Sequence, residues 1–536
     1  KCAEDAMKIL NNYNNLVINN EIDINVYDTE IEIIPSVRDL KLELYNLESR
    51  KEWIYDESTA AQMVIMYGLL KSKFDLNPKL LFKTLGKHRG ADSNRSIVIG
   101  SLDIGGGTSD LMVCKYHYTF QDEIIELTPE PIYWESFNLA GDDLLKELIQ
   151  QIIIEGEEQS ANDKGCVGVI QNELLRKSIQ NVGQKLNGFF GSDSNNIGFK
   201  GKLMRVAFIN QIGIPIIHKM MEIANDNIDK ELSYSDLFES NPPSQELLRY
   251  FERHFGIRFE DLIWRLSSRK VNQIISSVFS KLVKQVSQIM SKLDCDIVVL
   301  SGRPTSFNEI EKLFHQYHPV SPNRLFNLNN YWIGRWYPFA DENGFIKDSK
   351  TVVTIGSLIS NLGGSQNRLG KIRINNNLLK TKLISTADYI GHINKNYISN
   401  VVLAPKKDEN EIIVHTLPFY IGFKKLNAQD YPSRVIYSIS FNNEKISEIL
   451  GRRSSIESTK IKDAVEDFKS KLRKKLPFKV ILSRDSEKDK EWLNMEEIVD
   501  NEGEEISKSN ISLTVQTLSD EDGFWLDTGE FILSIK

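Results

Sequence analysis

The residues best suited to chemistry lie in one glycine-rich segment, which reads Asp103-Ile104-Gly105-Gly106-Gly107-Thr108-Ser109-Asp110. A phosphate site needs backbone N–H groups that approach oxygen atoms closely, and glycines allow this because they have no Cβ. The hydroxyl and N–H of Thr108 can contact a terminal phosphate. The Asp103 carboxylate can accept hydrogen bonds from the water shell of Mg²⁺. The segment therefore predicts a site for phosphates and magnesium.

Two strands are needed to hold this segment. Residues 96–103 are typical of a buried strand, residues 111–118 form a second apolar run, and the glycines between them form a turn. The sequence thus predicts a hairpin around a glycine loop. Taken alone, a run of glycines is also consistent with a flexible turn.

The order strand, Asp-x-Gly-Gly-Gly-Thr-x-Asp, strand resembles the second phosphate motif of the superfamily of actin, sugar kinases and seventy-kilodalton heat-shock ATPases. The resemblance implies an α/β fold, in which an actin-like (ribonuclease H-like) ATPase lobe carries a helical insertion and precedes a C-terminal α+β or β-rich module. It implies ATP and Mg²⁺ as cofactors, with Asp103 holding the hydrated metal ion. The phosphate-binding residues that it implies are Gly105, Gly106, Gly107 and Thr108.

Residues 55–62 resemble the start of the first connecting helix of the heat-shock chaperones, and a helix is predicted over Ser58–Leu70. In that resemblance Glu57 stands where a carboxylate orients the attacking water, a role that needs an acceptor near the γ-phosphate. An acidic residue in a first helical turn is also favoured by the helix dipole. Both explanations of Glu57 stay open.

Residues 138–143 resemble the Gly-Gly-acid-acid turn of the chaperones, with Ala140 in place of one glycine. This implies nucleotide contacts from Gly141 and Asp142, although acidic residues also mark an ordinary helix start.

Residues 297–305 resemble the adenosine motif, in which Gly302 lets the backbone pass close to the nucleoside. The usual second glycine is Arg303, and the chaperones' adenine-stacking basic residue is Ser306. Arg303 can pair with a phosphate, stack on a base or block the pocket.

Residues 351–358 resemble the second connecting helix, which packs against the first in the chaperones. The superfamily's first phosphate motif, an Asp-x-Gly-x-Thr hairpin, has no counterpart before Glu57. We therefore expect an N-terminal segment outside this sequence to carry it.

The wider arrangement, including Leu-Pro-Phe-Tyr-Ile-Gly-Phe at 417–423, resembles the bacterial virulence-factor SrfB family over most of the chain. We expect a nucleotide-binding, chaperone-like or actin-like ATPase subunit that binds Mg·ATP between two lobes. A catalytically inactive nucleotide-sensing or structural scaffold on the same fold is the alternative. A sugar or acetate kinase has less support, because no polar substrate signature lies between the lobes.

The composition fits a folded protein, and we expect it to lie in the cytoplasm; the resemblance to SrfB implies a bacterial source. The chain has 536 residues, 41% hydrophobic and 26% charged residues, and a formal charge of -8 with both signs interspersed, so nucleic acid is not an expected partner. No run of about 18 apolar residues predicts a transmembrane helix. The four cysteines are far apart, which indicates reduced buried thiols.

At this length we expect several domains, and a protein partner or client is expected to bind the last of them. Short β-rich runs occur at 412–415, 434–441, 478–482 and 511–517, and residues 520–531 read as a hairpin. The predicted regions are 1–95, the remainder of lobe I with the first connecting helix; 96–155 and 290–364, the core of lobe II; 156–289, a helical insertion; and 365–536, a β-rich accessory domain.

Three basic residues, Arg265, Arg269 and Lys270, precede a long helix and are candidates for contact with adenine, although a solvated helix face explains them as well. The eight histidines show no metal or triad spacing. The aromatic cluster at 331–337 is expected to pack beneath a loop.

Overall fold

The computed structural model describes most of the chain from residue 57 onward. The described residues are 57–89, 95–155, 169–191, 197–226, 229–364, 368–381, 387–394, 397–427, 433–453, 461–485, 492–515, 525–531 and 533. The chain divides into two compact units, Lys1–Tyr55 and Asp56–Lys536, and the described residues all belong to the second. Most of the predicted first region, residues 1–56, lies outside them, as do Cys2 and Cys166.

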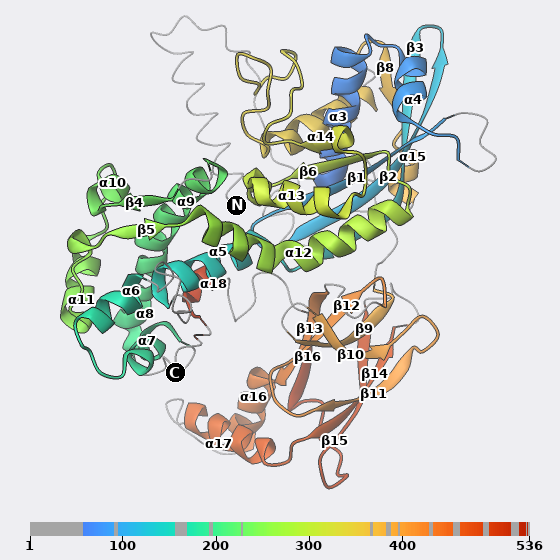
Figure 1. The fold of residues 1–536 in the computed structure, drawn as a ribbon. Helices are drawn as coiled ribbons and strands as arrows, with labels where there is room; N and C mark the ends of the chain where they lie inside the picture. Colours follow the sequence, from blue (N-terminus) through green and yellow to red (C-terminus); the bar gives the residue numbers. More distant parts are fainter. Residues whose placement is uncertain are drawn as a thin grey trace, which may run out of the picture. The chain divides into compact units, whose positions relative to one another are not determined.

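The central element is a six-stranded sheet in the order β7-β6-β1-β2-β3-β8 (Figure 1). The three strands that come first in sequence form an antiparallel meander. They are β1 (Ile97–Ile104), β2 (Ser109–Gln121) and β3 (Ile124–Phe137). On the other side of β1, β6 (Ile297–Ser301) and then β7 (Leu325–Asn327) continue the sheet in parallel. The predicted hairpin around the glycine loop is therefore confirmed.

Strand β3 was not predicted, and it contains Pro129 and Pro131. A proline cannot donate to a strand ladder, so it is tolerated only where its nitrogen faces away from the partner strand. Beyond residue 127, no described strand pairs with the outer side of β3, because β8 (Ile372–Ile374) pairs only with Ile125–Leu127. The two prolines thus remove donors from an open sheet edge. Since β8 joins this sheet, the sheet runs past the predicted lobe boundary at residue 364.

Helices cover both faces of the sheet. Adjacent residues on a strand point to opposite faces, and Gly100 and Ser101 of β1 show what lies on each. A Cβ at Gly100 would lie 3.0 Å from Met290 of α12 (Ser268–Lys292), whereas the Ser101 hydroxyl accepts a hydrogen bond of 2.7 Å from Gln62 of α3 (Glu57–Gly68). Helix α13 (Asn308–Tyr317) packs beside α12. The buried pattern of β1 follows from this double cover.

Helix α14 (Thr351–Gly363) packs against α3, as the two predicted connecting helices require. The contact is close at Gly356, where a Cβ would lie 1.9 Å from the carbonyl oxygen of Ala60. The aromatic cluster at 331–337 lies against α3, because the ring of Trp336 is 4.6 Å from the ring of Tyr67 in that helix. Tyr337 of the cluster is buried. The cluster therefore serves packing, as expected.

A helical subdomain follows α5 (Gly141–Leu148) and shares one hydrophobic core with the sheet. The prediction of mostly helical structure is confirmed for the described residues, with a short strand pair β4 (Lys230–Leu232) and β5 (Trp264–Leu266) added. Phenylalanine rings stack at its centre, with Phe208 and Phe251 5.2 Å apart. Its helices are α6 (Val169–Arg176), α7 (Val182–Phe190), α8 (Gly198–Phe208), α9 (Ile214–Asp226), α10 (Tyr234–Phe238) and α11 (Gln245–Phe255).

The C-terminal segment returns to this subdomain. The hairpin predicted at 520–531 is wrong over its described part, which forms the short helix α18 (Trp525–Thr528). The buried Arg205 side chain holds it, donating to the Thr528 carbonyl at 2.6 Å and to Glu530 at 2.8 Å. Satisfying a buried guanidinium outweighs the weak local strand pattern.

The described residues between β8 and this segment form a β-rich module with its own hydrophobic core. It contains a five-stranded sheet in the order β10-β9-β12-β13-β16 and a three-stranded sheet in the order β11-β14-β15. Two helices, α16 (Asn443–Arg453) and α17 (Ile461–Arg473), accompany them. The strands are β9 (Tyr389–Asn394), β10 (Tyr397–Leu403), β11 (Glu409–Val414), β12 (Phe419–Lys424), β13 (Arg434–Phe441), β14 (Phe478–Arg484), β15 (Leu493–Val499) and β16 (Ile511–Val515).

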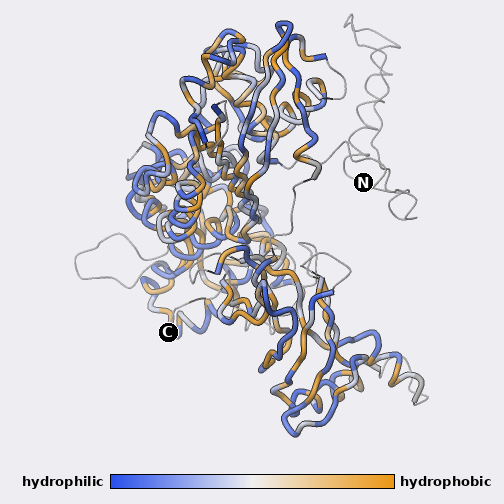
Figure 2. The backbone as a smooth tube through the Cα atoms, turned by 90° about the vertical axis from the view of Figure 1, so that its right-hand side faces the viewer, coloured by the Kyte–Doolittle hydropathy of each residue, from blue (hydrophilic) through white to orange (hydrophobic). Residues whose placement is uncertain are grey.

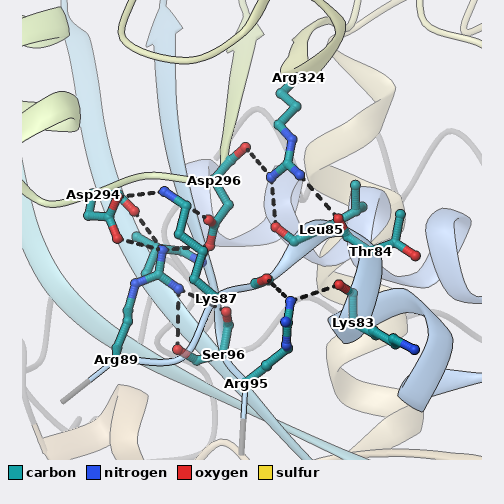
Figure 3. A network of polar contacts seen from close by, with 12 residues as sticks. Lys83, Thr84, Leu85, Lys87, Arg89, Arg95, Ser96, Asp294, Asp296 and Arg324 are labelled. Atoms are coloured by element: carbon teal, nitrogen blue, oxygen red, sulfur yellow. Dashed lines mark hydrogen bonds and ion pairs between the residues drawn. The ribbon is translucent and has the colours of Figure 1, made fainter.

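A buried carboxylate ties the starts of β1 and β6 together (Figure 3). Asp296 has a side chain with 0% exposure, and it accepts hydrogen bonds from the Val98 amide at 2.9 Å and from Arg89 at 2.7 Å. Arg324 donates to the carbonyls of Thr84 and Leu85, at the end of α4 (Pro78–Leu85). Losing one partner of a buried charge is costly, so this network fixes the register of the two strands.

No helix among the described residues is long and apolar enough to cross a bilayer, and polar and apolar stretches alternate along the backbone in Figure 2. The described cysteines, Cys114 and Cys295, are buried, as expected, and burial raises the pKa of the Cys295 thiol to about 12.

Replacing Gly356 by alanine is expected to destabilise the protein by about 3 kcal/mol, because the new methyl group would overlap the Ala60 carbonyl and force α3 and α14 apart. Gly188→Ala is the matched control: Gly188 is exposed in α7 with nothing near its Cβ position, so alanine there stabilises by up to about 1 kcal/mol. Thermal unfolding followed by circular dichroism measures both. Equal melting temperatures for the two variants would contradict the close helix contact.

Candidate functional site

A cavity of about 790 Å³ opens where the carboxyl ends of β1 and β6 meet. The parallel register places Asp103 directly opposite Ser301 at these strand ends. In open α/β sheets, ligands bind in the crevice outside the carboxyl ends of the strands. The cavity brings together most of the predicted site residues, namely Glu57, Asp103, Gly105, Gly106, Gly141, Asp142, Gly302 and Arg303.

Asp103 lines the cavity near the carboxyl end of β1, and the residue is 9% exposed to solvent. The Ser301 hydroxyl donates to its Oδ1 at 2.7 Å. Burial raises the pKa of Asp103, and the adjacent Glu57 carboxylate raises it further, while the Ser301 hydrogen bond and the positive charge of Lys350 act in the opposite direction. Two carboxylates thus face each other at the start of α3, and a cation between them would stabilise their ionised forms.

The glycine loop is held by its carbonyl groups, so some of its amides stay available. The Gly105 and Gly106 carbonyls accept hydrogen bonds of 2.9 and 2.8 Å from the amides of Gly141 and Asp142. Within the described part of the chain, the amides of Gly106, Gly107 and Thr108 donate no hydrogen bond. Gly107 and Thr108 do not line the cavity, and the Thr108 hydroxyl donates to Asp110 at 3.3 Å. Free backbone amides of this kind are able to donate hydrogen bonds to an anion.

The start of α5 orients a third carboxylate toward the cavity. Asp143 caps the helix by accepting a hydrogen bond of 2.8 Å from the Ala140 amide, which leaves Asp142 on the cavity wall. Burial, followed by the charge of Asp143, raises the pKa of Asp142. Ala140 is fully buried, and a Cβ at Gly141 would lie 3.0 Å from the Gly105 carbonyl. Small residues are therefore required here by the loop contact alone.

Glycine is required at position 302 by the backbone around it, a reason that the sequence did not predict. Its φ is +88°, and a Cβ there would lie 2.0 Å from the carbonyl oxygen of Ile104. The glycine is thus required by the end of β1, whether or not a nucleoside passes near it. Arg303, the next residue, is exposed on the cavity wall, and its charge, after burial, lowers the pKa of His218 on α9.

An apolar wall completes the cavity, and sequence reasoning missed it together with His218 and Lys350. The wall comes from α5 and α9, two helices more than sixty positions apart in sequence, and no local motif marks it. Only the tertiary fold brings its residues to the glycine loop. The residues from α5 and α9 are Leu144, Leu145, Leu148, Ile214, Ile217 and Met221, and Phe307 joins them from the position before α13.

Of the basic residues proposed for adenine, Arg269 and Lys270 do not line this cavity. Arg269 is exposed beside a separate shallow depression, where Asn272, Gln273 and Glu309 lie, and Lys270 is buried. No side-chain position is described for Arg265. Among the described residues, no group of three or more histidine, cysteine or carboxylate side chains could hold a metal ion by itself. A metal ion here would need water or ligand oxygens to complete its coordination.

Comparison with known families gives a match along nearly the whole described chain. The family described as "Virulence factor SrfB" matches residues 39–532. The chain belongs to the SrfB family. No curated protein matches the sequence. The SrfB match covers every wall of the cavity, the connecting helices and the β-rich module, so these parts form one family unit.

In this SrfB protein, Asp103→Asn is expected to stabilise the ligand-free fold at pH 7 by an amount on the order of 1 kcal/mol. The carboxamide still accepts from Ser301 and no longer repels Glu57. A raised pKa means that the folded state favours the protonated acid, so wild-type stability falls as pH rises above the ordinary value of 3.8. The advantage of the variant therefore shrinks as the pH falls toward that value.

Thermal unfolding in EDTA from pH 4 to pH 8 tests this prediction. Asp261→Asn is the control, because that side chain is 62% exposed. A lower melting temperature for Asp103→Asn than for wild type at pH 7 would overturn the assigned repulsion.

Proposed function

We propose that the cavity binds Mg·ATP and that the protein is an actin-like or heat-shock-like ATPase subunit. One observation carries the proposal: the acid at the end of β1, the glycine loop, the α5 turn and the Gly302 turn line a single cavity. These segments are separated by up to about two hundred residues in sequence, yet each brings to the cavity at least one residue that the resemblance assigns to the nucleotide or its metal ion. The volume also lies within the usual range for small-molecule sites.

The charge of the cavity favours a phosphate ligand that arrives with a divalent cation. Glu57, Asp103 and Asp142 place carboxylates on the same cavity wall as Gly106, whose amide is free. Phosphate oxygens alone would be repelled by these groups, whereas Mg²⁺ is attracted by both. Asp103 would hold the hydrated ion, since Mg²⁺ keeps most of its waters and needs few carboxylate ligands. When bound, the ion neutralises charge on the phosphates.

The remaining residues of the site each contact a different part of the nucleotide. The free amide of Gly106 on the cavity wall donates to a phosphate oxygen, the free amides of Gly107 and Thr108 follow it in the loop, and the apolar wall of α5 and α9 covers the nucleoside. Glu57 is an acceptor at the rim and orients the attacking water, so that the reaction is slow phosphoryl transfer to water. In this proposal the protein is cytoplasmic, and the β-rich module binds a partner or client protein.

A nucleotide-sensing scaffold without turnover is the second candidate. It is favoured by Arg303, which stands exposed on the cavity wall in place of the usual second glycine. Both candidates require nucleotide binding, and only phosphate release separates them.

Isothermal calorimetry with Mg·ATP is expected to detect binding to the intact wild-type protein, with affinity reduced at least tenfold in Asp103→Ala because the magnesium position is lost. Asp261→Ala, which removes an exposed carboxylate far from the cavity in sequence, should bind as wild type does.

Two results contradict the proposal. One is the absence of Mg·ATP binding by the wild-type protein, and the other is equal affinity of wild type and Asp103→Ala. Binding without phosphate release retains the site and identifies the scaffold.

A further inference from the structure

A lysine that no motif marks stands on the polar wall of the cavity. Lys350 is exposed and lines the cavity together with the first turn of α14. Within the described part of the protein, its ammonium group makes no ion pair or hydrogen bond. Its charge nevertheless acts on Asp103, so the ammonium lies near the acidic end of the cavity without closing on it. A cation held in this way leaves room for an anion between itself and the carboxylates.

The backbone that carries Lys350 is firmly held. Asp348 caps the turn by accepting a hydrogen bond of 2.9 Å from the Lys350 amide. The Thr351 hydroxyl donates to the Asp348 carbonyl at 2.6 Å and lies 2.7 Å from the hydroxyl of Tyr337. Further along α14, the close contact of Gly356 with Ala60 fixes this helix against α3. Because Glu57 begins α3, the lysine and this carboxylate belong to one rigid helix pair.

The other cation of the cavity lies at a different place. Arg303 acts electrostatically on His218 of α9, beside the apolar wall, whereas Lys350 acts on Asp103. The two positive charges therefore act on different residues of the cavity wall. Arg303 is near the wall assigned to the nucleoside, and Lys350 is near the residues assigned to the metal ion and the attacking water.

We infer that Lys350 binds the terminal phosphate of a nucleoside triphosphate and makes the site prefer a triphosphate over a diphosphate. This inference rests on the proposed nucleotide site. The terminal phosphate is the part of the ligand nearest to Glu57, because that carboxylate orients the water that attacks it. A diphosphate lacks this group and leaves the ammonium in solvent, so only the triphosphate gains the charge-assisted contact.

The test compares the affinities of Mg·ATP and Mg·ADP for the wild-type protein, Lys350→Gln and Lys350→Arg by calorimetry. Lys350→Gln is expected to weaken Mg·ATP about tenfold or more and to leave Mg·ADP within about twofold. Lys350→Arg keeps the charge and should recover most of the preference. Lys347→Gln is the matched control, since Lys347 is an exposed lysine of the same loop that does not line the cavity.

Each possible result either supports or contradicts the inferred role of Lys350. Selective loss of Mg·ATP affinity with recovery in Lys350→Arg supports the inference. An unchanged ATP to ADP ratio in Lys350→Gln overturns it while the nucleotide site stands, and so does an equal loss of both nucleotides, which indicates a general effect on the cavity. If the wild-type protein binds neither nucleotide, the proposed function fails, and the role of Lys350 fails with it. Unchanged melting temperatures without nucleotide show that the variants are folded.

Discussion

The backbone of Gly302 lies against the carbonyl of Ile104, and the candidate site depends on this contact. It allows β1 and β6 to end side by side, which sets Asp103 opposite Ser301. At the other end of the same strands, the buried carboxylate of Asp296 fixes the register through the Val98 amide. A shift of one residue would reverse the direction of every side chain on a strand. The strand pair is therefore fixed at both ends, and the cavity lies at the end where the chain turns.

The sequence predicted the parts of the fold that depend on local chemistry. The hairpin around the glycine loop followed from two apolar runs and three glycines, and the helix pair followed from its resemblance to known connecting helices. Strand β3 was missed because its prolines normally end strands, whereas here they lie on an open edge. Lys350 and the apolar wall were missed for another reason: they reach the cavity only through packing between distant helices. Likewise, a hairpin was predicted where the chain forms a helix at Trp525, because the sequence does not show that Arg205 bonds to this distant segment.

The electrostatics of the cavity set a condition on any ligand. Burial and mutual repulsion raise the pKa of Asp103, and burial raises that of Asp142, so an empty cavity carries an electrostatic cost. A neutral apolar molecule would relieve none of this cost, and a free anion would increase it. A ligand that combines a divalent cation with an anion relieves it, since the cation approaches the carboxylates and the anion approaches Lys350 and the loop amides. The charges of the cavity are thus the physical reason for proposing a metal-bound phosphate rather than a free one.

Helix α5 connects this cavity to the end of the chain. Its first residues donate hydrogen bonds to the glycine loop, while Lys146, near its other end, lies 5.9 Å over the ring of Trp525. The segment that carries Trp525 is anchored by Arg205 and by a hydrogen bond of 2.8 Å from the Phe531 amide to the Phe190 carbonyl. Residues 525–531 therefore pack in the core that the six-stranded sheet shares with the helical subdomain, although they follow the β-rich module in sequence. In sequence, the module thus lies between β8, which joins the six-stranded sheet, and a segment whose Trp525 contacts the helix that supports the glycine loop.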